Sequence, residues 1–165
     1  MHVKIKRLRP DAKLPVLGSK FAAGSDLFAC LDHDLVSIAA HQTRMIPTGL
    51  AIELPIGHFG AIFARSGLAS KRGLRPANCV GVVDSDYRGE IMVALHNDTD
   101  LNQTVENGER VAQLVVLPRE FAEFVEVDEL SRTERGDDGF GSSGEHEVKK
   151  KKRKEIELDD EFWTF

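Results

Sequence analysis

The sequence is poor in cysteine, in tyrosine and tryptophan, and in long apolar runs. Among its 165 residues are 2 cysteines, 1 tyrosine and 1 tryptophan. Cys30 and Cys79 form no Cys-x-x-Cys or Cys/His cluster, so we predict neither a disulfide framework nor a zinc site and expect two buried free thiols. No apolar run approaches the roughly 20 residues of a membrane-spanning helix, so a soluble protein without membrane contacts is expected.

An excess of basic charge is also absent. Lysine and arginine number 22 against 27 aspartates and glutamates, which gives a formal net charge of −5. Nonspecific binding to nucleic-acid backbones uses broad basic surfaces, so no nucleic-acid partner is expected. A small anionic ligand is compatible with this charge, since a few arginines and backbone N–H groups suffice to bind it. Residues 1–6 alternate apolar and basic side chains without a signal-peptide core, which favours a first strand and a cytoplasmic location.

Short β-type segments are present along most of the chain, whose length suits one domain. Their spacing between turn residues favours a sandwich, barrel or jelly roll. Within the last part, residues 111–117 are nearly all apolar and are predicted to be buried on both faces, as an interior strand or a subunit contact. The predicted strands are residues 3–8, 26–31, 35–38, 43–54, 58–64, 80–83, 90–97, 110–117 and 121–127.

Two stretches interrupt the β pattern. Residues 66–73 offer Ser66 as a helix N-cap and Gly73 as a C-terminal glycine, which predicts one or two helical turns. Residues 131–144 are rich in glycine and serine, so the folded domain is predicted to span 1–130, followed by a flexible arm over 131–144.

Arg65-Ser66-Gly67 lies where a predicted strand gives way to the short helix. Backbone N–H groups, the serine hydroxyl and the arginine fork can converge there on one phosphate. Taken alone, the tripeptide is better explained as an ordinary N-cap beside a surface arginine, because serine caps are common.

Two later segments carry further candidate chemistry. In residues 81–91 a turn with three acidic groups and the single tyrosine joins two apolar stretches, and a carboxylate at a strand end can orient water. Residues 135–144 place a cation and a phenylalanine on a glycine-rich strip that could close over a nucleotide. The alternatives are a plain hairpin connection for the first and an unfolded linker for the second.

Five segments in order closely resemble the motifs of the trimeric dUTPases. They are Ala-Gly-Ser-Asp-Leu at 23–27, Arg-Ser-Gly-Leu-Ala at 65–69, residues 81–91, Gly-Glu-Arg-Val-Ala-Gln-Leu at 108–114, and residues 135–144. The resemblance covers residues 1–144. It implies an all-β, jelly-roll-like β-barrel with one short helix, and a homotrimer with shared active sites. The implied activity is Mg²⁺-dependent hydrolysis of dUTP to dUMP and diphosphate, which limits uracil incorporation into DNA and supplies dUMP for thymidylate synthesis.

The resemblance also implies roles for individual residues. Arg65, Ser66, Gly67 and Gln113 correspond to the phosphate-binding positions of the family, and Asp26 to an aspartate that contacts the metal through water. The positions that hold the pyrimidine and the sugar correspond to Asn78, Gly81, Val82, Val83, Tyr87 and Met92.

Catalysis is implied to rest on Asp84, which corresponds to the carboxylate that activates the water for in-line attack on the α-phosphorus. Tyr87 corresponds to the aromatic residue that packs under the deoxyribose and leaves no room for a 2′-hydroxyl. In the glycine-rich arm, the resemblance places Arg135 on the γ-phosphate and Phe140 over the uracil. The remaining contacts of the arm correspond to Gly141, Ser142 and Ser143.

Two positions depart from the family pattern. Ala64 stands where proline is usual before Arg-Ser-Gly, and Asp138 replaces a common glycine in the fifth motif. Neither change removes a functional group, although Asp138 adds negative charge close to the expected triphosphate.

Two other functions compete with dUTP hydrolysis. A dCTP deaminase shares the fold, but Ser66-Gly67 and Asp84-Ser85-Asp86-Tyr87 resemble the pyrophosphatase pattern. A non-catalytic regulatory module is the alternative from another class, against which the intact Asp84, Tyr87, Arg135 and Phe140 argue.

The tail at 145–165 lies outside the resemblance. A basic run at 149–154 stands between acidic residues, which is typical of an unfolded, solvated extension or a cloning remnant. Phe162, Trp163 and Phe165 at the end suggest a second hypothesis, a short peptide that docks into a protein partner. The basic run would then serve as a nuclear-import signal if the host is eukaryotic.

Overall fold

The computed structural model describes residues 1–134, 136 and 137. By its contacts the chain divides into two units, Met1–Glu123 and Phe124–Phe165. All the helices and strands of the described residues belong to the first unit. They are β1 (Lys4–Arg7), β2 (Val16–Leu17), β3 (Ser25–Phe28), β4 (Leu35–Ile38), β5 (Thr43–Pro47), β6 (Leu50–Glu53), β7 (His58–Phe63), α1 (Ser66–Arg72), β8 (Leu74–Pro76), β9 (Gly81–Val83), β10 (Met92–Asn97), β11 (Gln103–Glu106) and β12 (Arg110–Pro118).

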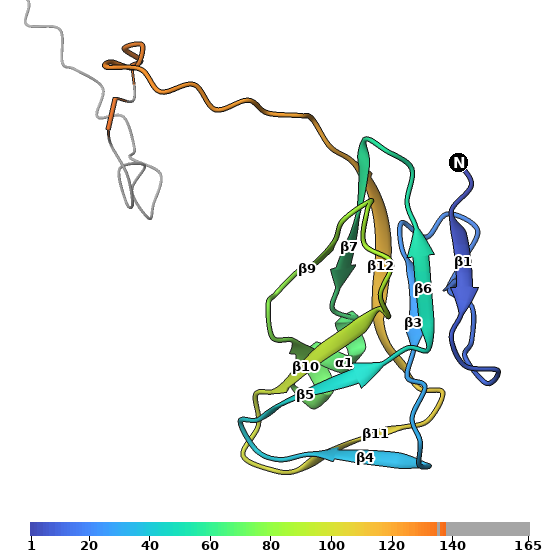
Figure 1. Cartoon of the computed structure of the whole chain (residues 1–165). Coiled ribbons are helices and arrows are strands. Elements are labelled where there is room, and N and C mark those ends of the chain that lie inside the picture. The colour runs from blue at the N-terminus through green and yellow to red at the C-terminus, as the bar shows by residue number, and fades with distance from the viewer. Residues whose placement is uncertain (135, 138–165) are drawn as a thin grey trace, which may run out of the picture. The chain divides into compact units, whose positions relative to one another are not determined.

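The first unit is built from four antiparallel sheets (Figure 1). The largest has five strands in the order β2-β3-β12-β7-β9, with β12 paired to β3 on one side and to β7 on the other. The smaller sheets have the orders β1-β6, β5-β10-β8 and β11-β4. Strands far apart in the sequence are therefore neighbours, as jelly-roll connections require. This is the all-β architecture with one short helix that the sequence predicts.

One apolar core joins the separate sheets. Leu27 of β3, Ile46 of β5, Leu95 of β10, Val105 of β11 and Val111 of β12 are all completely buried and belong to one cluster. Strand β10 alternates half-buried and buried residues, because one of its faces turns toward this core. The sheets therefore close around a shared interior.

Strand β12 is the interior strand that its apolar sequence predicts, but only part of it is buried on both faces. Val111, Ala112 and Leu114 are buried, whereas Val115 and its two successors are half-buried. The second half of the strand thus keeps an apolar face that the other described residues of the first unit do not fully cover.

The single strand predicted over 43–54 is wrong, because the chain turns at Thr48 and Gly49 and forms β5 and β6. Gly49 has a φ of +68°, and a Cβ there would lie 2.7 Å from the Cβ of Ala12. The Gly49 N–H donates to Glu90 Oε1 at 2.7 Å, and the Thr48 hydroxyl donates to the Ile91 carbonyl at 2.7 Å. These bonds hold the corner at which the chain passes from one sheet to another.

Other strand predictions also need correction. The structure adds β2, β8 and β11, which are too short or too polar to show a strand pattern in the sequence. Residues 121–127 form no strand, and the side chains of Phe121 and Phe124 are exposed. An alternating pattern needs a neighbouring strand before it becomes a sheet, and the described residues supply none there.

The short helix forms where predicted, with one change at its start. Its N-cap is Arg65, in extended conformation and without a side-chain capping bond, so the prediction of Ser66 as the cap is wrong. Ser66 is the first helical residue, and its carbonyl accepts a hydrogen bond from the Ser70 hydroxyl. At the other end Gly73 takes the left-handed conformation, as predicted, and its N–H donates to the Ala69 carbonyl at 3.1 Å.

The two cysteines differ in their surroundings. Cys30 is a buried free thiol, as predicted, but Cys79 is exposed, so the prediction of two buried thiols is wrong. The predicted domain boundary at 130 stays a prediction, and residues 138–165 lie outside the described part. Within the described residues, no helix combines the length and apolarity needed to cross a membrane.

Candidate active site

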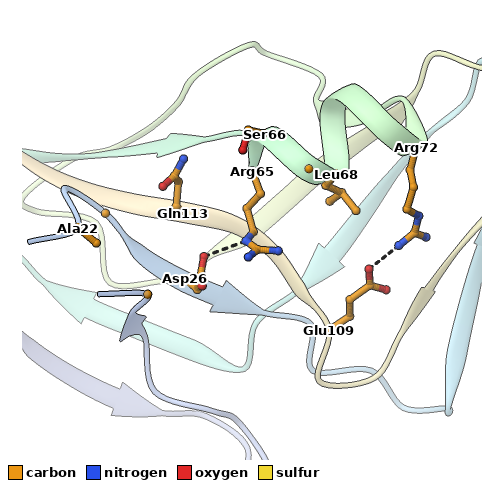
Figure 2. Close-up of a pocket in the computed structure, with 11 residues that line it drawn as sticks. Ala22, Asp26, Arg65, Ser66, Leu68, Arg72, Glu109 and Gln113 are labelled. Carbon is orange, nitrogen blue, oxygen red and sulfur yellow. Dashed lines mark hydrogen bonds and ion pairs between the residues drawn. The ribbon is translucent and has the colours of Figure 1, made fainter. Parts of the chain in front are cut away.

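A polar cleft of about 410 Å³ lies between the start of α1 and strands β3 and β12, and we call it the arginine pocket. Figure 2 shows Leu68 and Arg72 of α1, and Arg65 just before the helix, pointing toward the strands that form the other wall. Five of the predicted site residues line it: Asp26, Arg65, Ser66, Gly67 and Gln113. Strand β7 ends just before Arg65, so the geometry of the sheet sets where this arginine leaves the backbone.

An ion pair orients Arg65 inside the arginine pocket (Figure 2). Its Nε donates to Asp26 Oδ1 at 2.9 Å, while Arg110 Nε lies 3.3 Å from Asp26 Oδ2. The Asp26 side chain is only 13% exposed, so each of its oxygens faces an arginine in a sheltered position. The Arg65 bond uses Nε and leaves the two Nη groups without a protein partner in the described part of the chain. Those groups are a suitable donor pair for an anion.

Gln113 fixes the strand end that leads into Arg65. Its Nε2 donates to the Ala64 carbonyl at 2.9 Å, across the pair of strands β7 and β12. Gly24 lies against the same side chain, because a Cβ at Gly24 would be 3.1 Å from Gln113 Oε1 and 3.2 Å from Val115 Cγ2. The glycine of the first motif therefore permits the close approach of β3 to the glutamine.

A second, more apolar cleft of about 310 Å³ lies beside β9 and β10, and we call it the tyrosine pocket. Among the described residues, it contains every one predicted for the pyrimidine, sugar and catalytic positions. These are Asn78, Gly81, Val82, Val83, Asp84, Tyr87 and Met92. Sequence reasoning did not find Met45 of β5, which also lines the cleft; it pairs with Ala94 of β10, a neighbour that only the fold supplies.

Asp84 directly follows β9 and begins the turn that carries Tyr87. The Asp84 carbonyl accepts a hydrogen bond from the Tyr87 N–H at 3.2 Å, and the Asp84 side chain is exposed at the mouth of the cleft. The tyrosine hydroxyl donates to the Glu90 carbonyl at 3.0 Å. A Cβ at Gly89 would lie 2.4 Å from that hydroxyl, so only glycine lets the ring take this position. The turn thus presents the Asp84 carboxylate and one fixed aromatic ring to the cleft.

The loop before β9 contains a strained residue. Cys79 has a φ of +60°, and the Val80 N–H donates to the Asn78 carbonyl at 2.6 Å, which closes a γ-turn. The Asn78 amide lies over Gly81, since a Cβ there would be 3.5 Å from its Nδ2. Strain of this kind is concentrated at ligand sites, where the surrounding structure imposes it.

The structure divides the predicted site residues between the two pockets, which share no lining residue. The predictions for Arg135, Phe140, Gly141, Ser142 and Ser143 lie outside the described residues. Sequence reasoning missed an ion pair that also lines the arginine pocket. It joins Arg72 in the last turn of α1 to Glu109 in the fourth motif.

No group of three or more histidine, cysteine, aspartate or glutamate side chains is arranged to hold a metal ion in the described part of the chain. Asp26 is the carboxylate of the arginine pocket predicted to contact a metal through water, and both of its oxygens already face arginines. A divalent cation would therefore take most of its ligands from the phosphates of a bound nucleotide and from water.

A polar pocket with two arginines and a separate apolar pocket with a carboxylate and a tyrosine, both on an all-β scaffold, are the features expected of a nucleotide-binding protein. The sequence model of the dUTPase family matches residues 10–144. The chain belongs to the dUTPase family.

Named relatives and solved structures agree with this assignment. The deoxyuridine 5'-triphosphate nucleotidohydrolase of Desulfitobacterium hafniense is 54% identical over 147 residues, which cover 87% of this chain and 97% of the relative. The enzyme of the same name from Escherichia phage T5 is 50% identical, with 86% and 98% covered. The structure of Staphylococcus bacteriophage 80alpha dUTPase with dUPNHPP matches with a TM-score of 0.79 at 30% identity and covers 87% of this chain and 98% of that one. The predicted all-β dUTPase fold is thereby confirmed.

Proposed function

We propose that this chain is a dUTP nucleotidohydrolase, which hydrolyses dUTP to dUMP and diphosphate. The proposal rests on where the motif residues lie in the structure. Every described position expected to bind phosphate lies in the arginine pocket, and every described position expected to bind the nucleoside or water lies in the tyrosine pocket. Membership of the dUTPase family and the names of the relatives support the same activity.

In the proposed mechanism, Arg65, Ser66, Gly67 and Gln113 bind the phosphate oxygens. The Asp26 contact holds the Arg65 guanidinium in place before substrate arrives, so little reorganisation is needed when charge develops on the α-phosphate. Asp84 orients a water molecule for in-line attack on the α-phosphorus, and diphosphate leaves on the opposite side. Positioning and charge neutralisation account for most of the barrier reduction in such phosphoryl chemistry.

Selectivity is proposed to come from the tyrosine pocket. The Tyr87 ring, held by its bond to the Glu90 carbonyl, packs under the deoxyribose and excludes a 2′-hydroxyl. Asn78 and the backbone of β9 bind the pyrimidine edge. A cytosine would leave buried hydrogen-bonding groups unpaired, and such unpaired groups can lower kcat/KM about 10⁴- to 10⁵-fold. Thymine is excluded by the bulk of its methyl group.

Magnesium is the proposed cofactor. Bound to the triphosphate, it neutralises charge on the phosphate oxygens. This chain's contribution is the Asp26 carboxylate. It would accept hydrogen bonds from metal-bound water with the oxygen lone pairs that Arg65 and Arg110 do not use. The donor set fits a cation carried in by the nucleotide and does not fit a resident metal.

A homotrimer with shared active sites is the proposed assembly. One chain carries the two pockets as separate clefts, and a neighbouring copy would bring its tyrosine pocket to the arginine pocket of the first. Val82 is 64% exposed and Met45 is 53% exposed in the single chain, as expected of apolar groups that a second surface covers.

Mixing inactive subunits tests this assembly. Arg65→Gln and Asp84→Asn chains, each inactive alone, are expected to regain activity when denatured and refolded together, since a mixed trimer contains some sites with both residues intact. Light scattering should give the mass of a trimer at the assay concentration. A monomeric mass, or no regained activity in a mixture that forms mixed trimers, would contradict shared sites.

The glycine-rich arm is proposed to close the site, with Arg135 on the γ-phosphate and Phe140 over the uracil. Truncation after Leu130 should abolish hydrolysis, while deletion of residues 146–165 should leave it intact. Unchanged activity after the first truncation would refute the closing role, and lost activity after the second would show that the tail belongs to the enzyme. The tail itself is proposed to dock to a protein partner, which a pull-down lost on the same deletion would support.

Release of diphosphate from dUTP and the four common dNTPs is the direct test of the proposed function. dUTP alone should react at a substantial rate. Ammonia release from dCTP would instead favour the deaminase alternative, and dUTP binding without turnover would favour a regulatory module.

A further inference from the structure

The Arg72–Glu109 ion pair occupies the far end of the arginine pocket from Arg65. Figure 2 shows one ion pair at each end of α1: Arg65, just before the helix, with Asp26, and Arg72, in its last turn, with Glu109. Arg72 Nη1 donates to Glu109 Oε1 at 2.5 Å, and Nη2 donates to the Thr104 carbonyl. The side chains are 34% and 24% exposed, so solvent screens this pair less than it screens a surface pair.

Glu109 is itself fixed in the turn that enters β12. Its Oε2 accepts from the Glu106 N–H at 3.0 Å, and its carbonyl accepts from the Ala29 N–H at 2.8 Å. The next residue, Arg110, faces the Asp26 carboxylate that holds Arg65. The two ion pairs therefore fix both ends of α1 relative to the strand that carries Gln113.

The charges of the pocket wall balance only while both arginines are present. Arg65 and Arg72 contribute two positive charges, and Asp26 and Glu109 contribute two negative charges. Without Arg72, the Glu109 carboxylate would face the pocket unpaired and repel an anionic ligand.

We propose that Arg72 and Glu109 are positioning residues for triphosphate recognition. Arg72 masks the Glu109 carboxylate, so the Arg65-Ser66-Gly67 segment meets the anionic ligand without an unpaired negative charge in the pocket wall. This inference rests on the proposed dUTP hydrolysis and adds two residues to it.

The test uses a charge-neutralising series with a matched control. Arg72→Gln should raise KM for dUTP and weaken binding of dUPNHPP about tenfold, because the unpaired Glu109 carboxylate repels the anionic ligand, while kcat changes by less than about twofold. The double variant Arg72→Gln/Glu109→Gln should recover most of that loss, because the unmasked carboxylate is gone. Arg72→Lys should keep most of the affinity, and the Arg72→Gln defect should shrink at high salt.

Arg75→Gln is the control. Arg75 makes a comparable pair with Asp98, at 2.7 Å, but does not line either pocket. KM should not change in this variant. Equal KM values for Arg72→Gln and Arg75→Gln, or a double variant no better than Arg72→Gln, would overturn the inference.

If Arg72→Gln does not fold, Arg72→Lys and Glu109→Gln replace it. Glu109→Gln must then weaken dUPNHPP binding less than about threefold, because it removes a repulsive charge and keeps the cation. A larger loss would overturn the masking role. Failure of the proposed function can be distinguished from failure of this inference, since the wild-type protein would then not hydrolyse dUTP. In that case inorganic pyrophosphate replaces the nucleotide as the binding probe. Arg72→Gln must still weaken the binding of pyrophosphate.

Discussion

The arginine pocket and the tyrosine pocket adjoin the same five-stranded sheet but are built in opposite ways. In the arginine pocket, charged side chains hold one another: Arg65 with Asp26, and Arg72 with Glu109. In the tyrosine pocket, the groups that should meet the nucleoside are exposed apolar side chains and backbone, held by a strained turn and a glycine contact. A half-buried charge needs a partner already in place, as both arginines have here, whereas an apolar wall can be completed by another surface.

The largest expected effect removes the carboxylate at the mouth of the tyrosine pocket. Asp84→Asn should lower kcat at least about 10²-fold, the scale of a lost general base, while dUPNHPP still binds. Steady-state release of diphosphate measures kcat, and calorimetric titration measures the binding of dUPNHPP. Asp86→Asn is the matched variant, because Asp86 shares the turn but does not line the cleft, and it should have a much smaller effect. Turnover close to wild type in Asp84→Asn would remove Asp84 from the mechanism.

The next prediction concerns a substitution that removes the ion pairs of Asp26 in the arginine pocket. Asp26→Asn leaves Arg65 and Arg110 without their carboxylate and should lower the free energy of unfolding by about 1–3 kcal/mol, as well as raising KM. Asp98→Asn serves as the comparison, since its pair with Arg75 is about 40% exposed and should contribute less than about 1 kcal/mol. Denaturant unfolding of both variants checks the difference. Equal losses would mean that shelter from solvent does not distinguish the two pairs.

The third prediction concerns substitutions that change the tyrosine pocket and should leave the fold intact. Tyr87→Ala should reduce the preference for dUTP over UTP at least about tenfold, the scale of one lost steric contact, because space opens for the 2′-hydroxyl. Gly89→Ala should act in the same direction, since its Cβ would displace the tyrosine hydroxyl. The ratio of kcat/KM values measures selectivity, and stability should change little because the turn is exposed. An unchanged ratio in both variants would refute the steric role of the ring.

The smallest expected effect concerns Cys30, outside both pockets. Burial raises the pKa of its thiol, so the unfolded chain loses this proton at lower pH than the folded chain does. The free energy of unfolding should therefore fall as the pH rises above the ordinary thiol pKa, and Cys30→Ala should flatten that decline. Denaturant unfolding at several alkaline pH values checks this, with Cys79→Ala expected to keep the decline because Cys30 remains. A slope that Cys30→Ala does not alter would contradict it.

Much of the fold could be predicted from local patterns. β4 matches its predicted range at 35–38, and β12 differs by one residue at its end. The corner at Gly49 could not be predicted, because its cause is the close approach of Ala12 and a bond from Glu90, both distant in sequence. The N-cap also differs, because the backbone is still extended at Arg65 and Ser66 is already the first helical residue, one position past the cap.

The sequence by itself determined the β-rich class, the short helix and the identity of the chemical groups, because strand periodicity, glycine placement and motif order are local properties of a chain. Only the tertiary structure decided how those groups are shared between two pockets. It also decided that Asp26 faces two arginines and that Arg72 meets Glu109. These contacts join residues 37 to 84 positions apart, and only the closure of the sheets around a common core brings such residues together.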